Sequence, residues 1–362
     1  MTVARPSNAA KRFSVAGRGG TLMSEKEFKV AAAQAAPVYM DLGRTVEKAC
    51  DMIADAGRQG ARLVVFPEAF IPGYPDWVWL VPARDKAGLN SLYAELLGNA
   101  VSIPSPAIEK VCRTAKRARV SVAVGISERN ADASGTSMFS TLLYIDPEGR
   151  LVARHRKLVP TGGERLVWGH GDGSTLQAAE LPVGRVGGLI CWENYMPLAR
   201  YAMYALGTEI YVAPTWDQGE PWLSTLRHIA KEGRVYVVGC CTVMRRDDIP
   251  DRFEFKALYP PGRVWINTGG SAIADPDGKI IAGPLEMQEG LLIAEVDPRR
   301  VRGARWILDV AGHYARPDVF QLTVNREERP MVRGADLPGK SRAPGRPHGT
   351  AGATPKSKAR KR

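Results

Sequence analysis

The stretch GRVGGLICWENYMPLARYAMYALGTEIYVAPTW, residues 184–216, decides the fold that this sequence predicts. Small and apolar residues over 184–191 indicate a buried strand, and 209–216 indicate a second strand. Between them, residues 196–207 are typical of a helix, with Pro197 in its first turn and Gly207 as its stop. This order of elements is typical of a sheet whose parallel strands are joined by helices.

The same order of elements is found near the N-terminus. Residues 28–38 predict a strand, 45–61 an amphipathic helix, and 62–70 a short strand that is buried on both faces. The segments 143–157 and 271–284 each contain Asp-Pro-x-Gly between apolar runs, which indicates a tight hairpin. The chain therefore looks like two similar halves. The predicted fold class is α/β, with one domain made of two sheets that are each covered by helices.

The positive charge of the chain is concentrated at its ends. The 362 residues carry a formal net charge of +12. Residues 1–27 hold five basic and two acidic residues, residues 333–362 hold nine and one, and the remainder holds 36 and 35. We expect an ordered domain over 28–325, flanked by basic, mostly disordered extensions over 1–27 and 326–362, because these extensions contain few apolar residues.

Cysteine and hydropathy patterns exclude several classes of protein. An odd number of cysteines without C-x-x-C spacing argues against a disulfide framework and against a zinc site. No apolar run approaches the ~18 residues that a membrane-spanning helix needs, and the first residues lack the apolar core of a secretory signal. We expect a cytoplasmic protein with reduced thiols and with no membrane or nucleic-acid partner. The five cysteines are Cys50, Cys112, Cys191, Cys240 and Cys241.

Three polar side chains are predicted to lie at strand ends. Cys191 precedes a helix at the edge of a sheet where α/β proteins place their sites, and the helix start favours a thiolate. Glu68 follows an apolar strand, which suits a general base with a raised pKa or, equally, a structural salt bridge. Lys157 ends a basic run next to apolar residues, so part of this run is predicted to turn inward, although charge runs are usually solvated.

Four segments give the sequence a family resemblance. In this chain order, the glutamate, the lysine and the cysteine resemble the nitrilase superfamily, and the similarity extends over residues 28 to about 325. Cys-Trp-Glu after the strand resembles true nitrilases more than the amidase or carbamoylase branches. The four segments are FPEAFIPGYPDW (66–77), HRKLVPTGGERLVWGHGDGS (155–174), GGLICWENYMPLARYAMYALG (187–207) and GHYARPDVF (312–320).

The resemblance implies a fold, a site and an assembly. It implies a four-layer α-β-β-α sandwich, in which Cys191 is the nucleophile, Glu68 the general base and Lys157 the cation that stabilises the tetrahedral species. It makes Glu164 a second glutamate that orients the site. No metal or organic cofactor is implied, and family members pair through the helix behind the cysteine, often growing into larger homo-oligomers or spirals. One departure from the family is Gly162–Gly163, which we expect to widen or loosen the pocket beside Glu164.

Aromatic residues near these segments are candidates for the substrate pocket. Trp192 follows the nucleophile, so its backbone N–H is expected to stabilise the developing anion and its ring to wall the pocket. Glu193 is expected to be structural and to pair with a nearby base. Packing in the core would explain each aromatic residue at least as well as substrate contact. The remaining candidates are Tyr74, Trp77, Trp79 and Trp216, of which Tyr74 and Trp216 join Trp192 as the predicted substrate-binding residues.

The predicted function is hydrolysis of a small-molecule nitrile to a carboxylic acid and ammonia. The same four site residues would also serve an amidase, a carbamoylase or a cyanide dihydratase. A different class of function is a polyanion-binding or scaffold protein that acts through its basic tail, with a charge of +8 over 333–362. The nearly neutral body, which has no interleaved basic and aromatic residues, argues against that alternative.

Overall fold

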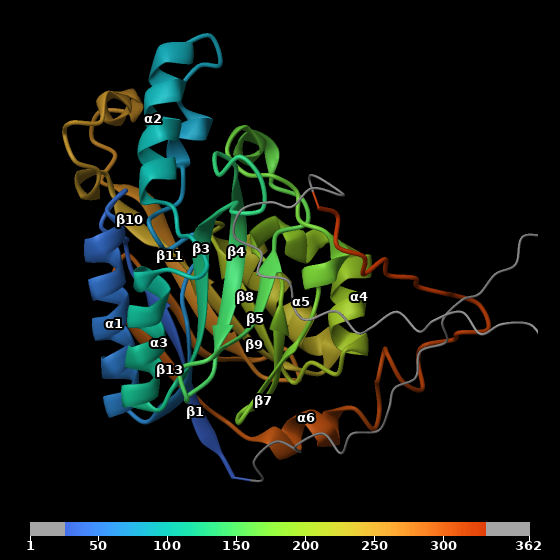
Figure 1. Cartoon of the computed structure of the whole chain (residues 1–362). Coiled ribbons are helices and arrows are strands. Elements are labelled where there is room, and N and C mark those ends of the chain that lie inside the picture. The colour runs from blue at the N-terminus through green and yellow to red at the C-terminus, as the bar shows by residue number, and fades with distance from the viewer. Residues whose placement is uncertain (1–25, 331–362) are drawn as a thin grey trace, which may run out of the picture.

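The computed structural model of this chain describes residues 26–330. Most of the two predicted basic extensions therefore lies outside the described residues. Within residues 26–330, two sheets lie between two layers of helices (Figure 1). This arrangement confirms the predicted four-layer α-β-β-α sandwich.

The first sheet has six strands in the order β13-β1-β2-β3-β4-β5. Strands β1, β2 and β3 are parallel, whereas β4, β5 and β13 join by antiparallel pairing. Helices α1 and α3 cover its outer face side by side. These elements are β1 (Phe28–Gln34), α1 (Leu42–Arg58), β2 (Ala61–Val65), α3 (Pro106–Ala118), β3 (Ser121–Arg129), β4 (Met138–Ile145), β5 (Leu151–Arg156) and β13 (Gly290–Val296).

The second sheet has seven strands, of which six follow the order β10-β11-β9-β8-β7-β6 while β12 pairs with β11. Strands β7, β8 and β9 are parallel, and helices α4 and α5 cover the outer face. The elements are β6 (Ala179–Leu181), β7 (Gly184–Gly188), α4 (Pro197–Ala205), β8 (Ile210–Thr215), α5 (Glu220–Gly233), β9 (Tyr236–Cys241), β10 (Val243–Arg245), β11 (Trp265–Ala274) and β12 (Ile280–Glu286).

Apolar side chains fill three layers of core. One cluster lies between the sheets and takes residues from both, such as Val65 and Val212. Two further clusters lie between each sheet and its helices. Cys240 belongs to the inter-sheet cluster and Cys241 to the cluster beneath the helices, so they lie on opposite faces of β9. Cys50 is buried on the inner face of α1.

Both predicted hairpins are present, between β4 and β5 and between β11 and β12. The carboxylates of Asp146 and Asp275 each accept a hydrogen bond from the backbone N–H four residues later, at 2.8 and 3.1 Å. Gly149 and Gly278 take φ values of 79° and 83°, a conformation that costs glycine little. The Asp-Pro-x-Gly turn is therefore stabilised in the same way in both halves of the chain, by the aspartate carboxylate and a glycine with positive φ.

Two strands end earlier than predicted, and both shortened ends lie at the site. Strand β2 ends at Val65 rather than at residue 70 because Pro67 has no N–H to continue the pairing, so Glu68 lies in a loop. Strand β7 ends at Gly188 rather than at residue 191. The Glu193 carboxylate accepts the N–H of Ile190 at 2.9 Å and draws the chain into a 3₁₀ turn over Cys191–Tyr195.

The remaining elements lie at the edges of the sandwich. Helix α2 (Lys86–Asn99) stands next to the loop before β11, to which the 2.7 Å ion pair between Glu95 and Arg252 joins it. Helix α6 (Pro298–Ala304) follows β13, and residues 305–330 form no helix or strand. Within the described residues, no helix is both long and apolar enough to cross a membrane.

Candidate active site

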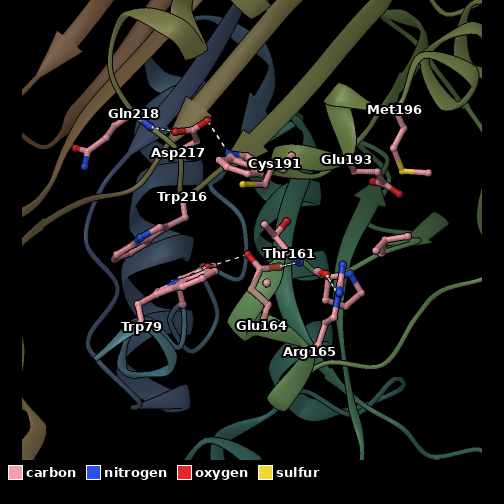
Figure 2. A pocket seen from close by; sticks show the side chains of 15 residues that line it. Trp79, Thr161, Glu164, Arg165, Cys191, Glu193, Met196, Trp216, Asp217 and Gln218 are labelled. Carbon is pink, nitrogen blue, oxygen red and sulfur yellow. Dashed lines mark hydrogen bonds between the residues drawn. The ribbon is translucent and has the colours of Figure 1, made fainter. Parts of the chain in front are cut away.

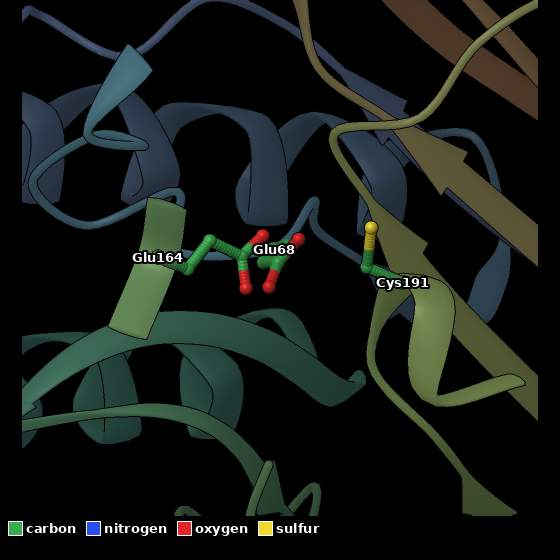
Figure 3. Close-up of side chains that lie close together, drawn as sticks. All are labelled: Glu68, Glu164 and Cys191. Carbon is green, nitrogen blue, oxygen red and sulfur yellow. The ribbon is translucent and has the colours of Figure 1, made fainter. Parts of the chain in front are cut away.

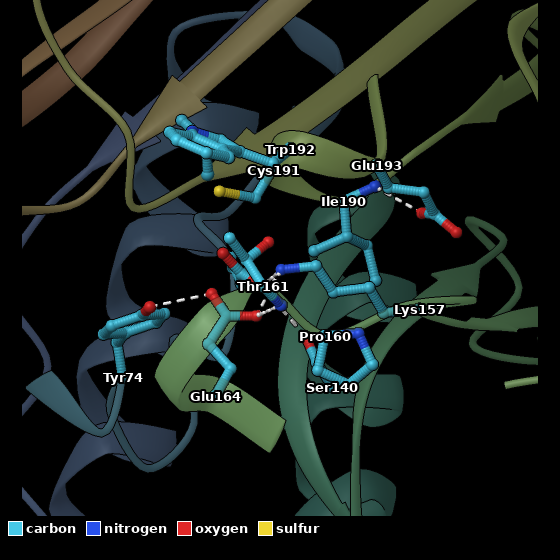
Figure 4. Close-up of polar contacts among 12 residues, drawn as sticks. Tyr74, Ser140, Lys157, Pro160, Thr161, Glu164, Ile190, Cys191, Trp192 and Glu193 are labelled. Atoms are coloured by element: carbon cyan, nitrogen blue, oxygen red, sulfur yellow. Dashed lines mark hydrogen bonds and ion pairs between the residues drawn. The ribbon is translucent and has the colours of Figure 1, made fainter. Parts of the chain in front are cut away.

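The predicted catalytic side chains meet between the two sheets (Figures 3 and 4). The Lys157 ammonium donates to Oε1 of Glu68 and to Oε2 of Glu164, at 2.7 Å each. A carboxylate oxygen from each glutamate and the Cys191 sulfur all lie within 4.8 Å of one another. None of the four residues is more than 4% exposed. Residues separated by up to 123 positions in the chain thus share one dry cluster.

The loop that carries Glu68 depends on a glycine in the neighbouring strand. A Cβ atom added to Gly125 on β3 would lie 2.2 Å from the Pro67 carbonyl oxygen and 2.9 Å from the Cα of Glu68. Only a residue without a side chain lets this loop approach so closely. Sequence reasoning missed Gly125, and the only available signal was a glycine inside an otherwise apolar strand.

Backbone conformation sets the direction of the nucleophile. Cys191 has a φ of 54°, a left-handed conformation that is uncommon outside glycine and costs about 1–3 kcal/mol. Glu193 stabilises this turn, since its carboxylate accepts the N–H groups of Ile190 and Leu158 at 2.9 and 2.8 Å and contacts His155 Nε2 at 3.0 Å. The predicted structural role of Glu193 beside a base is therefore confirmed.

The His155–Glu193 pair joins the nucleophile turn to strand β5. Burial lowers the pKa of His155, but Glu193 more than offsets this effect, so the pKa of His155 is raised. Burial raises the pKa of Glu193, but His155 and the two backbone N–H groups lower it below its usual range. The turn after Cys191 is thus fixed by the contact between His155 and Glu193 to the strand that precedes Lys157.

Glu68 has the properties of a general base. Burial raises the pKa of Glu68, Lys157 lowers it in part and Glu164 raises it, and the resulting value is about 7. Oε1 of Glu68 also accepts a hydrogen bond from Ser140 at 3.2 Å, while Oε2 is buried and has no hydrogen-bond partner among the described residues. A carboxylate with one free oxygen and a pKa near neutrality can take up and release a proton.

The charge state of the thiol differs from the expectation. Burial raises the pKa of Cys191, the Glu68 carboxylate raises it further and Lys157 offsets only part of this, so the thiol holds its proton. Helix α4 begins six residues later, at Pro197, too far away to favour a thiolate as predicted. Burial lowers the pKa of Lys157, but the surrounding anionic groups more than reverse this effect and keep the ammonium charged.

Glu68, Glu164 and Cys191 are also residue types that bind metals, and their ligand atoms are close enough to share one ion. Lys157, however, donates to both carboxylates at 2.7 Å. A fixed positive charge therefore occupies the place between the carboxylates that a metal ion would take. The donor set fits an ammonium better than a divalent cation.

A cavity of about 740 Å³ opens onto Cys191 and Glu164 (Figure 2). All three predicted substrate-binding residues line it, although their contact with substrate stays a prediction. Trp79 also lines the cavity, whereas Trp77 is 1% exposed and belongs to the core. The lining residues are Tyr74, Trp79, Val159, Pro160, Thr161, Gly162, Glu164, Arg165, Cys191, Trp192, Glu193, Met196, Trp216, Asp217 and Gln218.

Several contacts fix this lining. The rings of Tyr74 and Trp216 stack with centroids 4.5 Å apart and an angle of 8° between their planes. The Trp192 indole donates to Asp217 at 2.9 Å, and its side chain is half exposed at the rim. Sequence reasoning missed Asp217, because nothing near it in the chain marks it as a neighbour of residue 192.

The glycine pair Gly162–Gly163, which we expected to widen or loosen the pocket beside Glu164, faces the ring of Trp79. A Cβ atom built on Gly162 would lie 2.9 Å from Cη2 of Trp79, and one on Gly163 would lie 3.5 Å from Cε3 of the same ring. The indole of Trp79 therefore occupies the space that a larger side chain would fill. The missing side chains are replaced by an aromatic ring from a different segment.

Comparisons with known proteins agree with this geometry. The family model described as carbon-nitrogen hydrolase matches residues 29–305. A protein named aliphatic nitrilase from Sinorhizobium fredii is 42% identical over 309 residues, which cover 84% of this chain and 98% of that relative. Nitrilase 2 of Arabidopsis thaliana is 40% identical, over 83% of this chain and 89% of that relative.

Solved structures show the shared fold. The C. elegans NitFhit protein matches with a TM-score of 0.64 at 20% identity, over 85% of this chain and 69% of that one. An amidase of the nitrilase superfamily from Nesterenkonia matches with a TM-score of 0.56 at 18% identity, over 80% of this chain and 98% of that one. Together with the family model and the relatives above, these matches show that the chain belongs to the carbon–nitrogen hydrolase family, in its nitrilase branch.

Proposed function

We propose that this enzyme hydrolyses a nitrile to a carboxylic acid and ammonia through a covalent intermediate on Cys191. One observation carries the proposal: the Lys157 ammonium lies 2.7 Å from both buried glutamates, within a cluster that also holds the sulfur of Cys191. Relatives that cover most of this chain are named nitrilases, which supports the nitrile rather than the amide as substrate.

The first step requires a proton transfer. Oε2 of Glu68 takes the thiol proton as the Cys191 sulfur attacks the nitrile carbon, because the buried thiol is not ionised beforehand. A carbon–sulfur bond forms, one π bond of the nitrile breaks, and its electrons become a second lone pair on the nitrogen. This nitrogen takes the proton that Glu68 removed from the thiol, which restores the Glu68 carboxylate. Lys157 stabilises the charge on that nitrogen, and Glu164 keeps the ammonium in place, so a thioimidate results.

The later steps use the same base. Glu68 removes a proton from a water molecule that attacks the thioimidate carbon and passes this proton to the nitrogen. The hydroxyl proton of the tetrahedral species then reaches the nitrogen through Glu68 as the carbon–nitrogen bond breaks, so ammonia leaves and a thioester remains. A second water molecule then releases the carboxylic acid and restores the thiol. Two water molecules are consumed for each nitrile, and the protein side chains return to their starting protonation states.

A substrate panel with a product assay tests this function. Aliphatic nitriles, arylalkyl nitriles, cyanide and the matching amides are incubated with the enzyme, and ammonia, acid and amide are quantified. We expect ammonia and acid from nitriles, and none from the Cys191→Ala variant, in which the covalent route is missing. Turnover of amides alone would identify an amidase. An amide product would instead match the relative from Lupinus angustifolius that is named a bifunctional nitrilase/nitrile hydratase.

We also propose that the enzyme is a homo-oligomer. Leu198 on α4 is 68% exposed, and Tyr195 just before this helix is 43% exposed. Trp306 and Phe320 in the segment after α6 are 79% and 74% exposed, so large apolar side chains gather on surfaces that association would cover. Light scattering is expected to show a dimer or a larger assembly, and Leu198→Glu is expected to reduce its size.

A cytoplasmic location is proposed on the basis of the thiols. All five cysteines are unpaired, and two of them, Cys240 and Cys241, are adjacent without bonding to each other. Free thiols of this number are typical of a reducing compartment. Cell fractionation with an antibody against the native protein tests the location.

A further inference from the structure

Trp79 and Gly162 form a close contact at the wall of the substrate cavity. Gly162 has a φ of 48°, and an added Cβ atom would lie 2.9 Å from Cη2 and 3.1 Å from Cζ3 of the Trp79 ring. These ring atoms cannot stay where they are if residue 162 carries a side chain. The ring lines the cavity although 49% of the residue remains exposed.

A chain of hydrogen bonds leads from this ring to the catalytic cluster, and Figure 4 shows its part from Tyr74 through Glu164 to Lys157. Trp79 Nε1 lies 3.1 Å from the Tyr74 hydroxyl oxygen, and that oxygen lies 2.7 Å from Oε1 of Glu164. An indole nitrogen can only donate, so the Tyr74 oxygen accepts from Trp79 and its own hydrogen is directed to Glu164. Oε2 of Glu164 accepts from Lys157 at 2.7 Å. The cavity wall is thus joined to the ammonium through two side chains.

The ring of Tyr74 has a second support that does not depend on its hydroxyl group. It stacks on Trp216 with centroids 4.5 Å apart, and it is 3% exposed. Figure 2 shows Trp79 and Trp216 on one side of the cavity, with Cys191 and Glu164 facing them. Removal of the Tyr74 hydroxyl group would therefore break the hydrogen-bond chain while the aromatic wall keeps its shape.

We propose that Trp79 is a specificity-determining residue that excludes bulky nitriles from the space beside Gly162, and that it is also a positioning residue for Glu164 through Tyr74. This proposal rests on the nitrilase function proposed above. Gly162 makes the arrangement possible because it leaves room for the indole. A smaller residue at position 79 would open that space to substrates with branched or aryl substituents.

The test compares a short linear nitrile, butyronitrile, with a bulky one, phenylacetonitrile. For each enzyme, kcat and KM are measured with both nitriles. The ratio compared is kcat/KM for phenylacetonitrile divided by kcat/KM for butyronitrile. Trp79→Ala is expected to raise this ratio at least about tenfold, because a space of a few methylene groups discriminates by ~10- to 200-fold. Trp79→Phe is expected to give an intermediate ratio, and it guards against a misfolded alanine variant.

Tyr74→Phe separates positioning from size selection. We expect kcat to fall about tenfold for both nitriles with KM and the ratio unchanged, because the lost hydrogen bond reaches a charged group that stabilises the transition state. Tyr93→Phe is the matched control, since the Tyr93 hydroxyl group also donates a hydrogen bond, at 2.6 Å to the carbonyl oxygen of Thr136, but the residue is absent from the cavity lining. Its ratio is expected to equal that of the wild type.

The outcomes are distinct from a failure of the proposed function. A wild-type enzyme that hydrolyses none of the nitriles in the panel described above overturns the nitrilase proposal, and this inference with it. If the wild type is active but Trp79→Ala and Trp79→Phe both keep its ratio within twofold, Trp79 does not select substrates. If Tyr74→Phe keeps the wild-type kcat, Trp79 does not position Glu164 through Tyr74.

Discussion

Two buried glutamates, Glu128 on β3 and Glu68 in the loop after β2, meet cationic partners on strand β5 or directly after it, and they differ in how completely they are hydrogen-bonded. Glu128 is 2% exposed and accepts hydrogen bonds on both oxygens, from Arg154, Arg156 and Thr141 at 2.6–3.0 Å. Glu68 is 1% exposed, yet only one of its oxygens has a partner among the described residues. Both clusters pair a carboxylate with cations, but only Glu68 has a carboxylate oxygen that lacks a hydrogen-bond partner among the described residues and can therefore accept a proton.

The difference teaches how a structural ion cluster can be told from a catalytic one. A carboxylate whose two oxygens both accept hydrogen bonds would lose some of those bonds if it took part in proton transfer, so such bonding favours a structural role. A carboxylate with a free buried oxygen next to a thiol can exchange a proton without breaking its other contacts. The free oxygen of Glu68 therefore supports its proposed catalytic role, and variants of both clusters test this comparison.

The largest effect is expected for Lys157→Ala. This variant removes the cation that neighbours both Glu68 and Glu164, so turnover should become undetectable and the free energy of unfolding should fall by about 3–5 kcal/mol. Ammonia release and denaturant unfolding measure the two effects. Retention of wild-type activity would contradict the proposed role of the ammonium.

Glu68→Gln is expected to reduce kcat by about 10²- to 10⁴-fold, the usual contribution of a general base. The amide keeps the shape of the side chain, so the melting temperature should change much less than in Lys157→Ala. Steady-state kinetics and thermal unfolding check this expectation. Equal losses of stability in the two variants would argue that the residue is structural, like Glu128.

The pH profile is expected to show the titration of Glu68. Because this base must be ionised and its pKa is about 7, kcat/KM should fall below neutrality and reach about a tenth of its plateau at pH 6. The apparent pKa will belong to the coupled cluster rather than to one group. Rates measured between pH 5.5 and 9 test this, and a flat profile down to pH 5.5 would exclude Glu68 as the titrating base.

The smallest effect on activity is expected for Glu128→Gln. Loss of this charge leaves Arg154 and Arg156 without their common partner, which should cost about 1–3 kcal/mol of stability while kcat stays within about twofold of wild type. Chemical denaturation and the nitrile assay provide the two measurements. A large fall in kcat with an unchanged free energy of unfolding would contradict the structural role assigned to Glu128.

Most elements of the fold could be predicted from the sequence because their causes are local. The helical periodicity of α1, the Asp-Pro-x-Gly hairpins and the strand–helix–strand unit around Cys191 all act over a few residues. The predicted strand ends were less accurate. Strand β7 stops at Gly188 because the Glu193 carboxylate accepts a hydrogen bond from the backbone N–H of Ile190. Strand propensities describe single residue types and do not include such a contact.

The sequence by itself determined which residue types could perform the chemistry and that they would follow strands. Only the tertiary structure decided that Lys157 lies between two carboxylates, that Gly125 makes room for the Glu68 loop and that Trp79 fills the space beside Gly162. These contacts join segments 7 to 89 residues apart, and they depend on how closely the sheets and loops pack. A difference of one ångström in that packing changes a hydrogen bond or a clash, and local sequence patterns do not encode distances of that size.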